Sequence, residues 1–294
     1  MNRPACIAAV LLLGSIGAGT LSQTSARRAP ILIGGYRVLS ADFHVHTFPF
    51  NWTTLAPWDV LLESQRHGLD AVLVAGHNFV WISQFAGWCS RLLGGPIAVP
   101  GEEIVSPRYH LIAVGVTRAV NWRRPAAAAI ADVHRQGGFA IAAHPEASFW
   151  PAFDENAMAA LDAAEVLHPD VYSSRKHASE IRQFFNRKPM TAIGSSDFHA
   201  LGYPGECRTY VFVRQADTAG ILEALRAGRT VVYNRNGPVY GDPALIQLAA
   251  REGRLPEPDP AASHPGPLAQ CSKIAALAAL LIAVLFRGSA DGRS

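Results

Sequence analysis

Residues 36–47 read Tyr-Arg-Val-Leu-Ser-Ala-Asp-Phe-His-Val-His-Thr, a largely apolar run that ends in imidazole side chains. The apolar part predicts a buried strand over residues 36–44. Because alternate side chains of an extended segment face the same side, His44 and His46 would present two imidazoles to one point. Asp42 would share that face, either as an acceptor that orients a histidine or as an ordinary polar residue at a strand end.

Short apolar runs alternate with helix-like segments through the rest of residues 27–253. Strands are predicted at 71–75, 97–99, 111–116, 139–143, 165–167, 190–194, 209–213 and 230–233, and helices at 57–67, 126–135, 154–163, 173–187 and 218–227. This alternation predicts an α/β fold with a mainly parallel sheet, either open or closed into a barrel. In both forms the chemistry lies at the carboxyl ends of the strands.

Many histidines and acidic residues fall at these predicted strand ends. Neutral imidazoles together with carboxylates suit borderline divalent ions such as Zn2+, Mn2+ or Fe2+. One strand-end histidine alone is usually an ordinary polar residue, but the conjunction favours a metal centre. The candidates are His44, His46, His77, Glu103, His110, His144, Asp197 and His199, with His168 as a weaker member. By contrast, His67, His134 and His177 lie on predicted helices and are expected to be surface or helix-end residues.

Composition limits the class of protein. The chain has 294 residues, of which 49% are apolar and 17% charged, against about 25% charged in typical soluble domains. This excludes extensive disorder. The net charge of +3 gives no strong signal for nucleic-acid binding.

The two ends of the chain carry much of the apolar surplus. Residues 1–26 combine Arg3, an uncharged apolar run and small residues before Arg27, which is typical of an export signal or an uncleaved anchor. Residues 274–286 are wholly apolar but shorter than the roughly 20 residues that span a bilayer comfortably, so a membrane segment competes with a dispensable tail. Prolines predict an extended linker over 254–273. We therefore expect a body at residues 27–253 that is exported to the periplasmic or extracellular face and tethered to the membrane by its ends.

The cysteines of the body and the serines before Asp197 are predicted to have structural and not catalytic roles. Cys89 and Cys207 could pair in an exported protein, but two isolated cysteines define no framework, so buried free thiols are the simpler prediction. Ser195 and Ser196 lack the Gly-x-Ser-x-Gly elbow of a serine nucleophile and are expected to shape the turn before Asp197.

The order of the motifs resembles the PHP (polymerase and histidinol phosphatase) superfamily, particularly its smaller trinuclear phosphoesterases, over roughly residues 37–233. The motifs are His-x-His at 44–46, Gly-His at 76–77, Gly-Glu-Glu at 101–103, Ala-His-Pro at 143–145 and Asp-x-His at 197–199. The resemblance implies a distorted, TIM-like (β/α)7 barrel with up to three metal ions at the carboxyl ends of its strands. It further implies a first ion held by His44, His46, Glu103 and Asp197, a second by Glu103, His110 and His144, and a third by His77 and His199.

Two positions depart from the family pattern. Family members usually have Asp or His a few residues after the His-x-His motif, where this chain has Asn51, and commonly have Asp where it has Gly76. A neutral amide oxygen is a weaker ligand than a carboxylate. We therefore expect two firmly bound ions and a third that binds weakly or is absent.

The resemblance implies hydrolysis of small phosphate monoesters or diesters by a hydroxide held between divalent ions, without a side-chain nucleophile. Arg108, Arg175 and His168 are candidates for binding the substrate anion. Two alternatives stay open. One is an exported metallo-esterase or carbamate hydrolase, similar to the carbaryl hydrolases of the same superfamily. The other is a degenerate metal-binding module without activity, suggested by Asn51 and Gly76.

Overall fold

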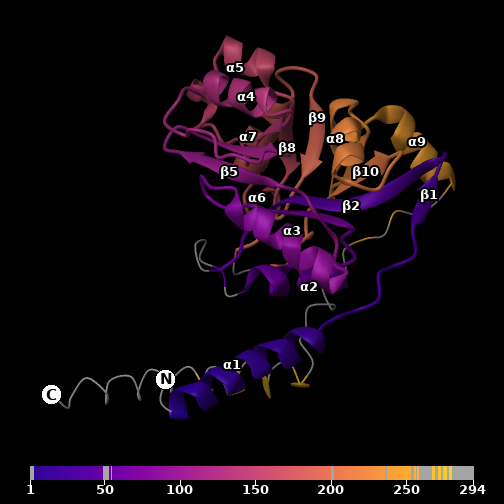
Figure 1. Cartoon of the computed structure of the whole chain (residues 1–294). Coiled ribbons are helices and arrows are strands. Elements are labelled where there is room, and N and C mark those ends of the chain that lie inside the picture. Colours follow the sequence, from indigo (N-terminus) through magenta and orange to yellow (C-terminus); the bar gives the residue numbers. More distant parts are fainter. Residues whose placement is uncertain are drawn as a thin grey trace. The chain divides into compact units, whose positions relative to one another are not determined.

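The computed structural model describes residues 3–48, 53, 55–199, 202–235, 237–252, 255, 257, 267–268, 271–272, 274–276 and 278–279 (Figure 1). The chain divides into two compact units, one made of residues 1–26 and 263–294 and the other of residues 27–262. Asn51, most of the predicted linker and most of the apolar segment 274–286 lie outside the described residues.

The first unit contains helix α1, Arg3–Leu21, whose apolar side chains are largely exposed. Val10 and Leu13 are 70% and 69% exposed. Within the described residues, no helix has both the length and the apolar character required to cross a membrane. Export and tethering therefore stay predictions.

The second unit is built on two β-sheets. The first has the order β12-β11-β10-β2-β3-β4, with β1 added to β2, and the second has the order β5-β6-β7-β8-β9. The strands of the first sheet are β1 (Ile31–Ile33), β2 (Tyr36–Val45), β3 (Ala71–Val74), β4 (Ile97–Ala98), β10 (Thr209–Val213), β11 (Thr230–Tyr233) and β12 (Val239–Gly241). Those of the second are β5 (Gly101–Ser106), β6 (Tyr109–Val114), β7 (Phe139–Ala142), β8 (Ala163–Leu167) and β9 (Thr191–Gly194).

The α/β class is confirmed, but the prediction of one mainly parallel sheet is wrong. Only β2-β3-β4 and β7-β8-β9 pair in parallel among the described strands, and the other neighbours are antiparallel. The difference arises partly because Pro107 and Arg108 form a two-residue turn that folds β5 and β6 into a hairpin. No closed barrel is found among the described strands. The two sheets meet through isolated bridges, at His77 with Glu103 and at Val45 with Phe198.

Helices cover the outer faces of both sheets (Figure 1). They are α2 (Pro57–Arg66), α3 (Trp81–Leu93), α4 (Ala126–Arg135), α5 (Glu155–Ala160), α6 (Asp170–Ser173), α7 (Arg175–Phe185), α8 (Thr218–Arg226) and α9 (Pro243–Glu252), with a short 3-10 turn at Trp150–Ala152. Proline in the first turn starts α2, as the sequence predicts. Helix α3 was not predicted, because apolar side chains lie on both its buried and its exposed faces and hide the helical period.

The main core joins the two sheets. Leu39, Phe43 and Leu73 from the first sheet and Ile112 and Ile141 from the second form one fully buried cluster. Burial of each such large apolar side chain contributes about 1.5–3 kcal/mol. This core holds the carboxyl ends of β2 and β3 close to β5, β6 and β7, which is where the candidate ligands lie.

Candidate metal centre

The two histidines of the His-x-His motif converge on one aspartate. Nε2 of His44 and Nε2 of His46 each lie 3.0 Å from Oδ1 of Asp197. Both imidazoles are completely buried. His44 is the second-last residue of β2, His46 directly follows the strand, and Asp197 follows β9, so the contact joins segments about 150 residues apart in the sequence. The i, i+2 spacing places the two rings side by side, as an extended strand requires.

The carboxylate of Glu103 lies at the centre of the histidine cluster. Its Oε2 is 3.0 Å from Nε2 of His77, 3.3 Å from Nε2 of His44 and 3.4 Å from Nε2 of His46. Its Oε1 is 2.9 Å from Nδ1 of His110 and 3.6 Å from Nε2 of His144. Each oxygen therefore faces its own group of imidazoles, which is the arrangement of a carboxylate that bridges two cations.

The remaining predicted ligand, His199, lies against the same cluster. Its ring centroid is 4.2 Å from that of His46. One ligand atom from each of His46, His77 and His199 lies within 4.8 Å of the others. The structure thus brings together all eight predicted metal ligands.

The predicted substrate contacts are placed less uniformly. His168 is buried with Nε2 3.3 Å from Oδ2 of Asp197 and Nδ1 3.3 Å from Oδ2 of Asp170. Arg108 lies in the exposed turn between β5 and β6, and Arg175 begins α7 with an exposed side chain. The contacts of the described residues join neither guanidinium to the ligand cluster.

Glu165 belongs to this site although the sequence analysis did not assign it. It is completely buried in β8, with Oε1 3.0 Å from Nδ1 of His44, while Oε2 accepts the backbone N–H of His144 at 2.7 Å. A carboxylate that accepts from Nδ1 leaves Nε2 of the same ring free to bind a metal. The available signal was an acidic residue inside the apolar strand Ala-Ala-Glu-Val-Leu, because a buried charge requires a partner.

Within the described residues, the carboxylate of Asp42 accepts hydrogen bonds from backbone N–H groups and not from an imidazole, so neither of its two predicted roles describes it fully. Oδ1 accepts the backbone N–H groups of His44 and Ser196, each at 3.1 Å, and Oδ2 accepts that of Gly205 at 2.7 Å. Burial raises the pKa of Asp42 to about 6 against the opposing effect of these hydrogen bonds. Its role is to tie the end of β2 to the loop that carries Asp197.

Backbone strain is concentrated in the same loops. His144 and Asp197 have φ angles of +25° and +46°, and Asn78, next to His77, has +66°. Each such non-glycine conformation costs on the order of 1–3 kcal/mol and persists only where its surroundings enforce it. The side chain of Asn78 does so by donating to the carbonyl of Val105 and accepting its N–H at 3.0 and 2.8 Å.

The charges in the cluster are strongly coupled. Burial opposes protonation of His44, but Asp197, Glu103 and Glu165 together hold its pKa well above 6.5. Burial lowers the pKa of His46 to about 4. The pKa values of Glu103 and Asp197 lie well below their usual range because His44 and other histidines outweigh the effect of burial.

One buried atom tests whether a metal ion fits. Nε2 of His44 has no hydrogen-bond partner although it is completely enclosed and two carboxylate oxygens lie within 3.3 Å. A buried polar atom in this position is costly unless it binds something. Imidazole nitrogens and carboxylate oxygens that converge in this way form the donor set of a divalent transition metal. The residues therefore fit the ions that the sequence predicts.

The structure also tests the predictions for the cysteines and for the histidines on helices, which lie outside the cluster. Cys89 and Cys207 are buried free thiols, as predicted. His67 ends α2 as expected, but it is buried against Tyr203 rather than exposed. His134 is an ordinary surface residue that pairs with Asp162 at 2.8 Å.

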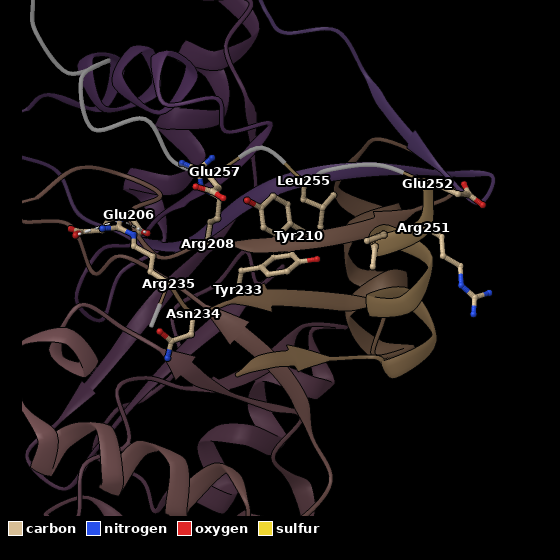
Figure 2. Close-up of a pocket in the computed structure, with 12 residues that line it drawn as sticks. Glu206, Arg208, Tyr210, Tyr233, Asn234, Arg235, Arg251, Glu252, Leu255 and Glu257 are labelled. Atoms are coloured by element: carbon tan, nitrogen blue, oxygen red, sulfur yellow. Dashed lines mark hydrogen bonds and ion pairs between the residues drawn. The ribbon is translucent and has the colours of Figure 1, made fainter. Parts of the chain in front are cut away.

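A separate cavity of about 800 Å³ lies beside β10, β11 and the end of α9 (Figure 2). Equal numbers of arginine and glutamate side chains line the cavity, so their charges give it no preference for an anion. The charged residues are Arg208, Arg235, Arg251, Glu206, Glu252 and Glu257. None of the eight predicted metal ligands belongs to its lining.

Comparison with known proteins finds a matching family model and several similar solved structures. The family model described as PHP-associated matches residues 177–230, which include Asp197 and His199. A crystal structure of a two-domain protein from Bacteroides vulgatus, described as containing a predicted PHP-like metal-dependent phosphoesterase, has the same fold. It shares 22% identity over 71% of this chain and 69% of its own, with a TM-score of 0.53.

Two further solved structures are less similar. A putative metal-dependent phosphoesterase from Bifidobacterium adolescentis is 17% identical over 58% of this chain and 89% of its own, with a TM-score of 0.42. An amidohydrolase from Chromobacterium violaceum is 14% identical over 55% and 88%, also with a TM-score of 0.42. No curated protein shows a significant sequence match.

The structure gives a physical reason for the departure from the PHP pattern at Gly76. A Cβ at this position would lie 2.3 Å from Cε2 and 2.7 Å from the carbonyl oxygen of Phe79. Gly76 also pairs with Phe79 in an isolated bridge. An aspartate therefore cannot occupy position 76 unless Phe79 moves.

Proposed function

We propose that this chain is a metal-dependent hydrolase of phosphate esters, with its active site at the His44–Glu103–Asp197 cluster. The observation that carries the proposal is the Glu103 carboxylate, whose two oxygens face different groups of imidazoles. The fold shared with a protein described as a predicted PHP-like metal-dependent phosphoesterase supports the same reaction class.

Bound divalent ions would supply an acidified water molecule and neutralise negative charge that develops on the ester oxygens. His44, His46, Glu103 and Asp197 would hold one ion, His110 and His144 would share Glu103 for a second, and His77 and His199 would serve a weaker third. The identity of the ions is open between Zn2+, Mn2+ and Fe2+, because all three accept imidazole and carboxylate ligands.

The protein's own residues orient this ligand set. Glu165 accepts from Nδ1 of His44, and the carbonyl of Ala75 lies 3.0 Å from Nδ1 of His46, so the Nε2 atoms of both rings point to the cluster. Neighbouring carboxylates, against burial, raise the pKa of His168 to about 10. Nε2 of His168 lies 3.3 Å from Oδ2 of Asp197, which leaves Oδ1 facing the His-x-His pair.

We also propose that the two sheets act as one distorted (β/α)7 barrel with the strand sequence β2-β3-β5-β6-β7-β8-β9. Backbone hydrogen bonds support this proposal at both junctions. The N–H of Glu103 donates to the carbonyl of Gly76 at 3.0 Å, and the N–H of His46 donates to that of Phe198 at 2.9 Å. Such closure would place all ligand-bearing strand ends around one mouth.

We further propose that the protein is exported and tethered by its apolar ends. The composition of residues 1–26 and the exposed apolar side chains of α1 support this location. Protease added to intact cells or spheroplasts should degrade the body if the proposal holds. Protection of the body until the cytoplasmic membrane is lysed would contradict it.

The reaction is tested with the purified full chain, stripped of metal and reloaded with Mn2+, Zn2+ or Fe2+. We expect metal-dependent release of nitrophenol from p-nitrophenyl phosphate or its bis-ester, lost in Glu103→Gln. Glu102→Gln is the matched control, because Glu102 is also buried in β5 but accepts the N–H of Val120 at 2.6 Å, outside the cluster. Turnover of naphthyl acetate or carbamates alone would replace the phosphoesterase by the esterase alternative, and metal binding without turnover would indicate a non-catalytic module.

A further inference from the structure

Helix α3 carries an exposed apolar stripe in addition to its buried face. Ile82, Ala86 and Cys89 pack inward, in one cluster with Val72 and Val74 of β3. On the outer side, Trp81, Phe85, Trp88 and Leu92 are 47%, 36%, 51% and 65% exposed. Their spacing of four, three and four residues aligns them along one side of the helix. We call these four residues the α3 stripe.

The stripe is aromatic, and its helix carries little charge. The rings of Phe85 and Trp88 stack with centroids 5.8 Å apart, which makes their exposed surface continuous. Arg91 is the one charged residue in the helix, and there is no acidic residue. Clustered Trp and Phe with a basic residue nearby is the composition that partitions into the headgroup region of a bilayer. A surface of this kind is unfavourable in water, so it marks an interaction site.

Arg27, which directly follows the first 26 residues, is hydrogen-bonded to the carboxyl end of α3. The side chain of Arg27 donates through Nε to the carbonyl of Gly94 at 2.7 Å and through Nη2 to that of Gly95. Gly94 caps the carboxyl end of α3 in a left-handed conformation, two residues after Leu92. The segment that we propose to enter the membrane therefore joins the body at one end of the α3 stripe.

The short segment between α1 and Arg27 limits the distance between them. Five residues, 22–26, separate the end of α1 from Arg27. Fully extended, these residues and their two flanking bonds to Leu21 and Arg27 span at most about 20 Å. A membrane-inserted α1 would therefore hold the carboxyl end of α3 close to the bilayer surface.

From the exposed aromatic stripe and its attachment point we propose that the α3 stripe docks on the surface of a lipid bilayer. The occupant is the headgroup and upper acyl region, into which the indole and phenyl rings would insert while Arg91 faces lipid phosphates. Docking would orient the body instead of leaving it free to rotate on its tether. The inference rests on the proposed membrane tether and is independent of the proposed reaction.

Hydroxyl-radical footprinting of the full-length protein tests the docking, with and without vesicles of equimolar phosphatidylcholine and phosphatidylglycerol. Sedimentation of the vesicles reports the tether separately. On sedimented vesicles we expect oxidation of Trp81, Phe85 and Trp88 to fall several-fold. Trp122 is the internal control, because it lies elsewhere on the body over Arg123 and should be oxidised at an unchanged rate.

Each other outcome overturns the inference in a distinguishable way. Co-sedimentation without protection of the stripe would refute docking and retain the tether. Failure to co-sediment would refute both. Protection that needs no vesicles and rises with protein concentration would identify a second copy of the chain as the occupant.

A fluorescence measurement provides an independent check that does not require a disruptive change. Brominated lipids quench tryptophan that enters the bilayer. We expect Trp81→Phe with Trp88→Phe to lose most of the quenching, and the matched variant Trp122→Phe with Trp150→Phe to retain it. Equal quenching in the two variants would exclude insertion of the α3 stripe.

Discussion

Glu165→Gln tests whether Glu165 orients the imidazole of His44 for metal binding. The Glu165 carboxylate receives two donors, the Nδ1–H of His44 at 3.0 Å and the backbone N–H of His144 at 2.7 Å. A glutamine offers one oxygen and one NH2 group. Whichever way the amide turns, its NH2 faces one of those donors, so either the His44 tautomer or the backbone of the His144 loop loses its support.

The size of the effect follows from these contacts. Loss of a partner that orients a metal-ligating histidine typically reduces metal affinity about 10–100-fold, which corresponds to about 1.4–2.8 kcal/mol. A hydrogen bond to a charged group contributes about 1.5–3 kcal/mol to stability. We therefore expect weaker metal binding together with a lower melting temperature of the metal-free protein.

The assay is a titration of the metal-free protein with Zn2+ or Mn2+ against a competing chelator, run beside a thermal unfolding experiment. Glu102→Gln serves as the control, because it removes a buried carboxylate from the same sheet but not from the cluster. It should bind metal like the unmodified protein. A folded Glu165→Gln variant with unchanged affinity would refute the assignment of Glu165 as the residue that orients His44.

Three further perturbations give distinct outcomes. His44→Ala with His46→Ala should abolish the firmly bound ions measured by elemental analysis, and unchanged metal content would show that the site lies elsewhere. Gly76→Asp should lower the free energy of unfolding because its Cβ would overlap both the ring and the backbone carbonyl of Phe79, and adding Phe79→Ala should relieve only the overlap with the ring; a Gly76→Asp variant as stable as the unmodified protein would contradict the steric explanation. Burial raises the pKa of Tyr109 to about 12 from 10. Between these pH values the tyrosine ionises in the unfolded state but not in the folded state, so the free energy of unfolding falls as pH rises. Tyr109→Phe should reduce this fall in urea unfolding measured from pH 9 to 12, and an unaltered pH dependence would show that another group is responsible.

The sequence predicted secondary structure best where a local periodic pattern of apolar residues was sufficient to define one helix or strand. Helix α4 runs over Ala126–Arg135 as predicted, because its buried positions recur every three or four residues before two glycines. Strand β2 ends at Val45, within the His-x-His motif and one residue beyond the predicted end, since alternation along a strand requires no knowledge of the partner strand. The ligand cluster followed from the same local rule applied at several strand ends.

The pairing of strands could not be derived in this way. Glu102 and Glu103 were expected after a strand, but both lie within β5, where alternation sends Glu103 to the cluster and Glu102 to the opposite side near Val120. Antiparallel pairing of β5 and β6 depends on the turn at 107–108 and on contacts with β7, which is distant in the sequence. The role of Glu165 likewise depends on partners 121 and 21 residues away.

Anomalous diffraction from crystals of the metal-loaded protein tests the central claim most directly. The account predicts at least two anomalous peaks, one beside each oxygen of Glu103, with the first bound by His44, His46 and Asp197 and the second by His110 and His144. Ligand distances of about 2.0–2.2 Å would be expected for zinc. A single peak away from Glu103, or no peak in the cluster under saturating metal, would contradict the account.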